Sequence, residues 1–275
     1  MKNILFYLLL TATITACTTN STTTVENTSV FEDSIKTETS NSKPNSKENG
    51  KFFNLDGKKY LYGGADSLQH FDITDCALID SQFHYGIGRE EFPALLKPEF
   101  ISVTEADLIW NDTTRFLLAY SGKEVKAYSV EDLTRHEVVN DELNGQPIMA
   151  AYCVLADLGA IYTRTYGDKV LTFGLSGYTY HDDEVWDSVD GFVFWDRETE
   201  SLWWPLIGKA VSGPLNGVGL QEMDENNWMD TNWKTIKKDY PNAMILKSGQ
   251  DYERSKDWKK YTDVSDIIQK FTINE

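Results

Sequence analysis

The sequence predicts an α+β fold: a single, predominantly antiparallel β domain with a few short helices. Short runs of strand composition are separated by turn residues at close intervals. The chain shows neither a repeat of fixed period nor the alternation of strands and helices that builds a parallel sheet. Residues 51–275 are the expected globular part, because a chain of this length buries a substantial core.

The first elements of this globular part are short. Lys58–Tyr62 is expected to be a strand that ends at a pair of glycines. Ser102 and Glu105 have the spacing of a capping box, in which each side chain bonds to the backbone N–H of the other residue. We therefore expect a short helix that begins after Ser102 and ends at Asn111-Asp112.

Strands dominate the middle of the chain. Phe116–Tyr120 and Glu124–Val130 flank Ser121-Gly122, which predicts a hairpin. Further runs of strand composition are Pro147–Leu155, Ala160–Tyr166, Val170–Leu175, Phe192–Trp195 and Ala243–Leu246. Near the C-terminus we expect one helix capped by Thr231 and a terminal helix at Val264–Phe271.

The N-terminus has the pattern of a secretory signal peptide, expected at residues 1–16. Lys2 precedes a short apolar run, and small residues lead to Cys17. Ile14–Cys17 fits a bacterial lipobox, in which the cysteine becomes the first mature residue and carries a lipid. The apolar run is shorter than the roughly 20 residues of a spanning helix. We expect lipid on Cys17 to anchor the chain in the bacterial cell envelope. The outer membrane is the expected location, because Thr18 rather than Asp follows.

Residues 17–50 are expected to comprise the lipidated cysteine and a disordered tether. Ser, Thr and Asn fill most of positions 18–50, so the segment has too few apolar side chains to offset the entropy of ordering it. The formal net charge of −17 argues against nucleic acid as a partner, because phosphates need basic side chains. The expected partners are the membrane, through the lipid, and an unknown ligand or envelope protein.

An ordered series of segments resembles the bacterial domain-of-unknown-function family 3179 over residues 70–247. The matching segments are Phe92–Leu95, Pro98–Ser102, Lys126–Tyr128, His136–Asp141, Tyr152–Ala156, Thr172–Gly177, Asp196–Trp203, Gly208 and Gly213–Leu215. The chain departs from the family pattern at Ser129, at Arg135, and at Ala156, where the family has the second cysteine of a Cys-x-x-Cys pair. The resemblance implies a fold without an activity, because the family has none established.

These segments supply the candidate polar site. Its members are His136, Glu137, Asn140, Asp141, Cys153, Ser176, Asp196, Arg197 and Glu200. A structural network and a ligand or catalytic site both fit such residues. No metal and no cofactor is expected, because Asn140 stands where a His-Glu-x-x-His zinc motif needs histidine, and Ala156 removes the second thiol. Cys153 is either a core residue or a redox or metal-binding group, and its pairing with Cys76 stays open.

The aromatic residues and one acidic segment suggest two further surface features. Seven of the eight Trp residues lie between Trp186 and Trp258, so an exposed aromatic surface is expected in the C-terminal half. Tyr178, Tyr180 and Trp203-Trp204 either present ring faces to sugars or pack in the core. His181–Asp190 is rich in carboxylates and is expected to be a solvated loop, with weak Ca²⁺ binding as the alternative.

The sequence therefore predicts an envelope lipoprotein of unknown activity that acts as a ligand- or partner-binding module. The alternative is an enzyme or a metal- or redox-handling domain that uses the His136 region and Cys153. An exposed aromatic patch away from these residues would favour the first class. A pocket that joins His136, Cys153 and Asp196 would favour the second.

Replacement of Cys17 by alanine should abolish lipidation, because the acylated sulfur is lost. The mature protein is expected to enter the detergent phase on cloud-point separation, and the Cys17→Ala protein to stay in the aqueous phase. Equal partitioning of the two proteins would contradict the lipobox interpretation.

Overall fold

The structure is a computed structural model, and it describes residues 48–187, 189–251 and 259–273. The predicted signal peptide, Cys17 and the tether up to residue 47 lie outside the described residues. The first described element is the strand β1 (Glu48–Asn49), which lies within the last residues of the predicted tether. None of the described helices is long and apolar enough to cross a membrane.

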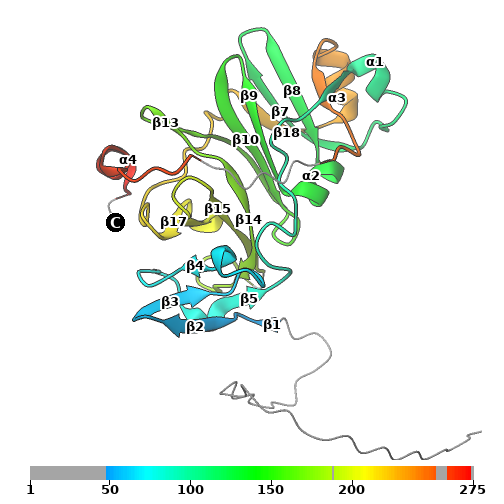
Figure 1. Cartoon of the computed structure of the whole chain (residues 1–275). Coiled ribbons are helices and arrows are strands. Elements are labelled where there is room, and N and C mark those ends of the chain that lie inside the picture. The colour runs from blue at the N-terminus through cyan, green and yellow to red at the C-terminus, as the bar shows by residue number, and fades with distance from the viewer. Residues whose placement is uncertain (1–47, 188, 252–258, 274–275) are drawn as a thin grey trace, which may run out of the picture. The chain divides into compact units, whose positions relative to one another are not determined.

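A six-stranded central sheet has the order β1-β5-β14-β15-β16-β17 (Figure 1). Its other strands are β5 (Phe83–Tyr85), β14 (Phe173–Tyr180), β15 (Gly191–Asp196), β16 (Leu202–Trp204) and β17 (Lys209–Ser212). A three-stranded sheet, here the β2–β4 sheet, consists of β2 (Phe52–Leu55), β3 (Lys58–Leu61) and β4 (Phe71–Asp72). Both sheets are antiparallel throughout.

Two larger groups of strands complete the β structure. The five-stranded sheet has the order β18-β7-β8-β19-β6, with β18 (Trp228–Asn232), β7 (Arg115–Ser121), β8 (Glu124–Ser129), β19 (Met244–Leu246) and β6 (Phe100–Ser102). The β9–β11 sheet holds β9 (Val138–Leu143), β10 (Gln146–Cys153) and β11 (Leu158–Thr163), and a small ribbon joins β12 (Thr165–Tyr166) to β13 (Lys169–Val170). Only β8 and β19 pair in parallel among the described strands, so the predominantly antiparallel prediction is confirmed.

The described helices are few and short, as predicted. They are α1 (Val103–Ala106), α2 (Val130–His136), α3 (Trp233–Asp239) and α4 (Ser265–Phe271), with 3-10 turns at Ser67–Gln69, Asp80–Gln82 and Pro205–Ile207. The capping box of Ser102 and Glu105 is present at α1. The cap of α3 is Asn232 rather than the predicted Thr231, because the Asn232 side chain accepts the Thr235 N–H at 3.0 Å.

Four hydrophobic clusters hold the sheets together as layers. The central sheet is buried on both faces: Phe173, Phe194 and Trp203 pack toward the β9–β11 sheet, whereas Tyr178 and Trp204 pack toward the β2–β4 sheet. A third cluster joins the β9–β11 sheet to the five-stranded sheet, whose other face is covered by α1 and α3. Because successive side chains of a strand point to opposite faces of the sheet, neighbouring aromatic residues pack in different layers.

This layering decides two questions that the sequence left open. Tyr178, Tyr180, Trp203 and Trp204 are at most 2% exposed, so they are core residues and not a sugar-stacking surface. Cys76 and Cys153 are both free thiols. Cys76 packs against the cluster on one face of the central sheet and Cys153 belongs to the cluster on the other, so the sheet separates them.

Strand β14 contains the one irregularity that positions the surface described below. Its pairing with β15 shifts register between Leu175 and Tyr178, so Ser176 and Gly177, which follow the predicted strand Val170–Leu175, form a bulge within a longer strand. Gly177 has φ +79°, and a Cβ built on it would lie 2.0 Å from the Gly88 carbonyl oxygen. The bulge therefore lets the segment 86–90 lie directly on the central sheet.

Replacement of Gly177 by alanine should lower the free energy of unfolding by about 2 kcal/mol or more, because both the backbone conformation and the contact with Gly88 oppose a methyl group. Gly208 is the matched control. It has φ +64° but no atom within 4 Å of a built Cβ, so Gly208→Ala should cost only about 1 kcal/mol. Urea unfolding of both variants measures the difference, and equal losses would contradict the close approach.

Candidate functional site

Two of the predicted polar residues join neighbouring strands and sheets. The Asn140 amide group accepts the Phe173 N–H and donates to the Phe173 carbonyl, both at 2.8 Å, which joins β9 to β14. The Asp141 carboxylate accepts from Lys126 Nζ at 3.0 Å and from the Tyr128 hydroxyl at 2.7 Å. These contacts are those of a structural network, which is one of the two interpretations that the sequence allowed for Asn140 and Asp141.

His136 and Cys153, to which the alternative assigns catalytic or redox chemistry, contact backbone groups of the chain itself. His136 Nδ1 lies 2.7 Å from the Pro93 carbonyl oxygen. Cys153 is 1% exposed, and its Sγ accepts the Phe192 N–H at 3.4 Å. Burial raises the pKa of the Cys153 thiol, so the reactive thiolate is disfavoured at neutral pH. Glu137 ends α2 with φ 53°, and burial raises its pKa to about 7.

Ser176 and Asp196 serve the local backbone. The Ser176 hydroxyl donates to the Val193 carbonyl and accepts the Tyr178 N–H, which stabilises the bulge. Asp196 accepts from the Thr199 N–H at 2.7 Å and from Trp203 Nε1 at 2.9 Å, so it shapes the turn after β15. Burial raises the pKa of Asp196 to about 7, although these donors act in the opposite direction.

The structure keeps two of the candidate residues, Cys153 and Asp196, apart. Cys153 contacts Phe192 near the start of β15, and Asp196 is the last residue of that strand. Four residues of extended strand separate these two points by about 13 Å. Cys153 and Asp196 therefore do not meet as the enzyme alternative would require.

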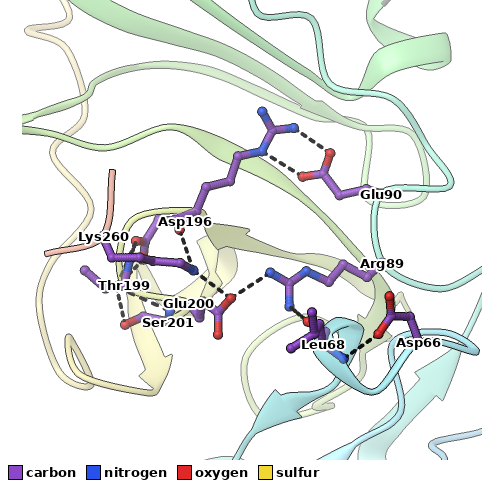
Figure 2. Close-up of polar contacts among 10 residues, drawn as sticks. Asp66, Leu68, Arg89, Glu90, Asp196, Thr199, Glu200, Ser201 and Lys260 are labelled. Carbon is purple, nitrogen blue, oxygen red and sulfur yellow. Dashed lines mark hydrogen bonds and ion pairs between the residues drawn. The ribbon is translucent and has the colours of Figure 1, made fainter. Parts of the chain in front are cut away.

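Arg197 and Glu200 belong to a charged cluster beside the 86–90 segment. Figure 2 shows Glu200 between Arg89 and Lys260. Arg197 Nε donates to Glu90 at 2.9 Å, and Arg89 Nη2 donates to Glu200 at 3.0 Å. Lys260 Nζ also lies 2.7 Å from Glu200. Arg89 and Arg197 are 7% and 1% exposed, and each lies against a carboxylate, as buried charges require.

Arg89 also connects this cluster to the β2–β4 sheet. Its guanidinium carbon lies 3.6 Å from the centroid of Trp195 and 4.8 Å from that of Phe71. The backbone N–H of Arg89 donates to the Gly63 carbonyl at 2.7 Å, and its side-chain Nη1 donates to the Leu68 carbonyl at 3.3 Å. Arg89 therefore fixes the loop between β3 and β4 against the central sheet.

At the start of this loop, Tyr62 lies beside Tyr85 of β5, and these two tyrosines form what we call the aromatic corner. The rings of Tyr62 and Tyr85 lie 6.3 Å apart at 52° to each other. Buried Tyr178 supports both: its hydroxyl donates to the Tyr62 carbonyl at 2.6 Å, and its ring packs edge-on against Tyr85 at 5.3 Å. Lys51 Nζ lies over the Tyr85 ring at 3.6 Å and 5.9 Å from the Tyr62 centroid.

The corner continues into a row of rings on the outer face of the β2–β4 sheet. Tyr62 contacts His70 at 5.2 Å, His70 contacts Phe53 at 4.9 Å, and Phe53 stacks on Tyr60 at 5.4 Å. All are partly exposed. The Gly63 N–H donates to His70 Nδ1, and burial lowers the pKa of His70, so this ring is neutral at physiological pH. We call Phe53, Tyr60, Tyr62, His70 and Tyr85 the aromatic face.

The prediction of an aromatic surface in the C-terminal half stays a prediction. Trp195, Trp203, Trp204 and Trp233 are at most 1% exposed and fill the cores, whereas Trp186 is 41% exposed and Trp258 lies outside the described residues. The aromatic face, which the sequence analysis missed, lies between residues 53 and 85. The signal for this face was the pair Asp56-Gly57, which has positive φ at both residues and closes the β2–β3 hairpin. Alternation then places Phe53 and Tyr60 opposite each other, facing away from Phe52 and Leu61.

The acidic segment also differs from expectation at one residue. Asp190 is 1% exposed, and its Oδ2 lies 2.8 Å from His84 Nδ1 and 2.6 Å from the Thr179 hydroxyl. This carboxylate therefore joins β5 to β14 just before the start of β15 and is not part of a solvated loop. Of the remaining acidic residues of the segment, Asp182 is half-buried, and Asp183, Glu184 and Asp187 are exposed.

The family profile described as "Protein of unknown function (DUF3179)" matches residues 89–271, about two thirds of the chain. This range begins later and ends later than the resemblance seen in the sequence. No curated protein and no solved structure matches the chain. The β2–β4 sheet and the aromatic face precede the matched range.

The raised pKa of Glu137 makes stability depend on pH. A carboxyl group whose pKa is 4.5 when unfolded and about 7 when folded binds its proton more tightly in the folded chain. Its contribution to stability is therefore complete below pH 4.5 and is lost as the pH rises through 7, to a total of about 3 kcal/mol. Glu137→Gln should remove this loss, which urea unfolding at pH 5 and pH 8 measures. The exposed Glu142→Gln is the control, and the same pH dependence in both variants would exclude Glu137 as the source.

Proposed function

The chain belongs to the DUF3179 family, and on that premise we propose that it is a binding module of the bacterial cell envelope, anchored by lipid on Cys17. Its proposed binding surface is the aromatic face. The observation that carries the proposal is a row of partly exposed rings in mutual contact, from Tyr60 to Tyr85. Aromatic rings are enriched where proteins bind partners, because they contribute large contact areas at low entropic cost.

The placement of this face supports binding over catalysis. It lies on the opposite side of the central sheet from the cluster that contains Cys153, and outside the His136 region. Leu68 and Ile87 are 81% and 49% exposed and flank it near Arg89. Exposed apolar residues beside a row of rings are typical of contact surfaces.

The contacts of the candidate residues support the enzyme alternative less well. His136, Cys153 and Asp196 each contact the local backbone, and strand geometry keeps Cys153 and Asp196 apart. The thiol with a raised pKa is poorly suited to nucleophilic or redox chemistry. The contacts of these three residues therefore support a reaction less well than the exposed rings of the aromatic face support binding.

The predicted tether, residues 18–50, supports a location for this function. As a flexible chain it would have an r.m.s. reach of roughly 30 Å and would hold the binding surface close to the membrane. At the inner side of an outer membrane, the nearest extended structure is the cell wall. We therefore propose a component of the cell wall as the ligand.

Co-sedimentation with purified, membrane-free cell-wall sacculi tests this function. The full chain in non-ionic detergent is expected to sediment with sacculi, and Phe53→Ala or Tyr62→Ala to weaken binding about tenfold, as the loss of a central aromatic contact does. Leu108→Ala is the matched control, because Leu108 is 90% exposed and follows α1, which covers the five-stranded sheet. Absence of binding by the unmodified chain, or equal binding by all variants, would contradict the proposal.

A further inference from the structure

We propose that the aromatic corner of Tyr62 and Tyr85 recognises a primary alkylammonium group, and that Lys51 of the same chain occupies the corner when ligand is absent. This inference rests on the proposed function, because it gives the chemistry of a ligand at the aromatic face. It adds a site and a built-in competitor that the proposed function does not require.

The position of Lys51 shows that the corner accommodates such a cation. Its Nζ lies over the face of Tyr85, 3.6 Å from the centroid, and 5.9 Å from the centroid of Tyr62. Both distances fall within the roughly 6 Å over which the negative face of an aromatic ring attracts an ammonium group. A lysine side chain on a ligand would present the same group to the same two rings.

The corner is held in this geometry before any ligand arrives. Tyr178 fixes the backbone of Tyr62 by a 2.6 Å hydrogen bond and supports the Tyr85 ring from its edge. The Tyr62 N–H donates to the Lys51 carbonyl at 2.9 Å, which keeps Lys51 beside the corner. Rigid rings reduce the entropic cost of binding, and attachment of Lys51 to the same chain makes it an effective competitor.

The charge of the protein as a whole favours a cationic ligand over an anionic one. The chain has a formal net charge of −17, so its long-range field attracts cations and repels anions. The neighbouring His70 is neutral at physiological pH and adds no repulsion. A neutral ligand would have neither the long-range attraction to the negative protein nor the electrostatic attraction of an ammonium group to the ring faces.

Two variants separate the competitor from the site. Lys51→Ala removes the internal ammonium group and should tighten the binding of an external one by about fivefold. Lys58→Ala, which removes a lysine paired with Asp72 on the same sheet, is its control and should leave the affinity unchanged. Tyr85→Leu keeps an apolar side chain against Tyr178 but lacks the ring, so it should abolish binding, and Tyr85→Phe should restore it.

Calorimetric titration of the full chain in non-ionic detergent provides the test, with Nα-acetyl-lysine amide as the cation and its Nε-acetylated form as the neutral match. We expect binding of the cation alone, in the order Lys51→Ala, then unmodified chain and Tyr85→Phe, then Tyr85→Leu. Equal binding of the neutral form, or no tightening in Lys51→Ala, would overturn the inference, and so would a preference for choline over the lysine derivative.

The outcome is distinguishable from that of the proposed function. Sedimentation with sacculi that depends on Tyr62, without selection for the cation, would leave the binding module intact and overturn the alkylammonium chemistry. Cation binding that follows the expected order, without sedimentation, would support the site and exclude the cell wall as the ligand.

Discussion

The structure depends on a central sheet that must bury both of its faces. Its strands carry large rings on either side, as Phe194 and Trp203 face one layer while Tyr178 and Trp204 face the other. Two further sheets cover these faces, and the β2–β4 sheet is one of them. Because this sheet is thin and packs with one face only, its other face is left for Phe53, Tyr60, Tyr62 and His70. A folding requirement therefore creates the surface that we assign to binding.

Polar residues of the kind that suggest chemistry hold these layers together. The amide of Asn140 and the carboxylates of Asp141 and Asp190 each bridge strands that the sequence keeps apart. Arg89 has the same role at the edge of the aromatic face, where it lies on Trp195 and holds the carbonyl groups of Gly63 and Leu68. Buried polar groups of this kind are costly without partners, so their consistent pairing is the sign of a structural network.

Sequence reasoning predicted the elements whose causes are local. The antiparallel class, the capping box at Ser102 and the β7–β8 hairpin follow from turn and cap chemistry within a few residues. It failed where distant segments decide the outcome. The bulge at Ser176 and Gly177 accommodates Gly88, which is distant in the sequence, and the rings of Trp203 and Trp204 are buried because two other sheets cover them. The aromatic face was missed because composition counts tryptophans, whereas exposure depends on which layer lies outermost.

The availability of the aromatic face in the full chain is the central claim, and nitration of tyrosines read by mass spectrometry tests it most directly. Buried Tyr178 and Tyr180 provide the internal reference, because both are at most 2% exposed. The account predicts that Tyr60 and Tyr62 are nitrated readily in the free protein and are protected when purified sacculi are added. Resistance of both residues in the free protein, or equal nitration with and without sacculi, would contradict it.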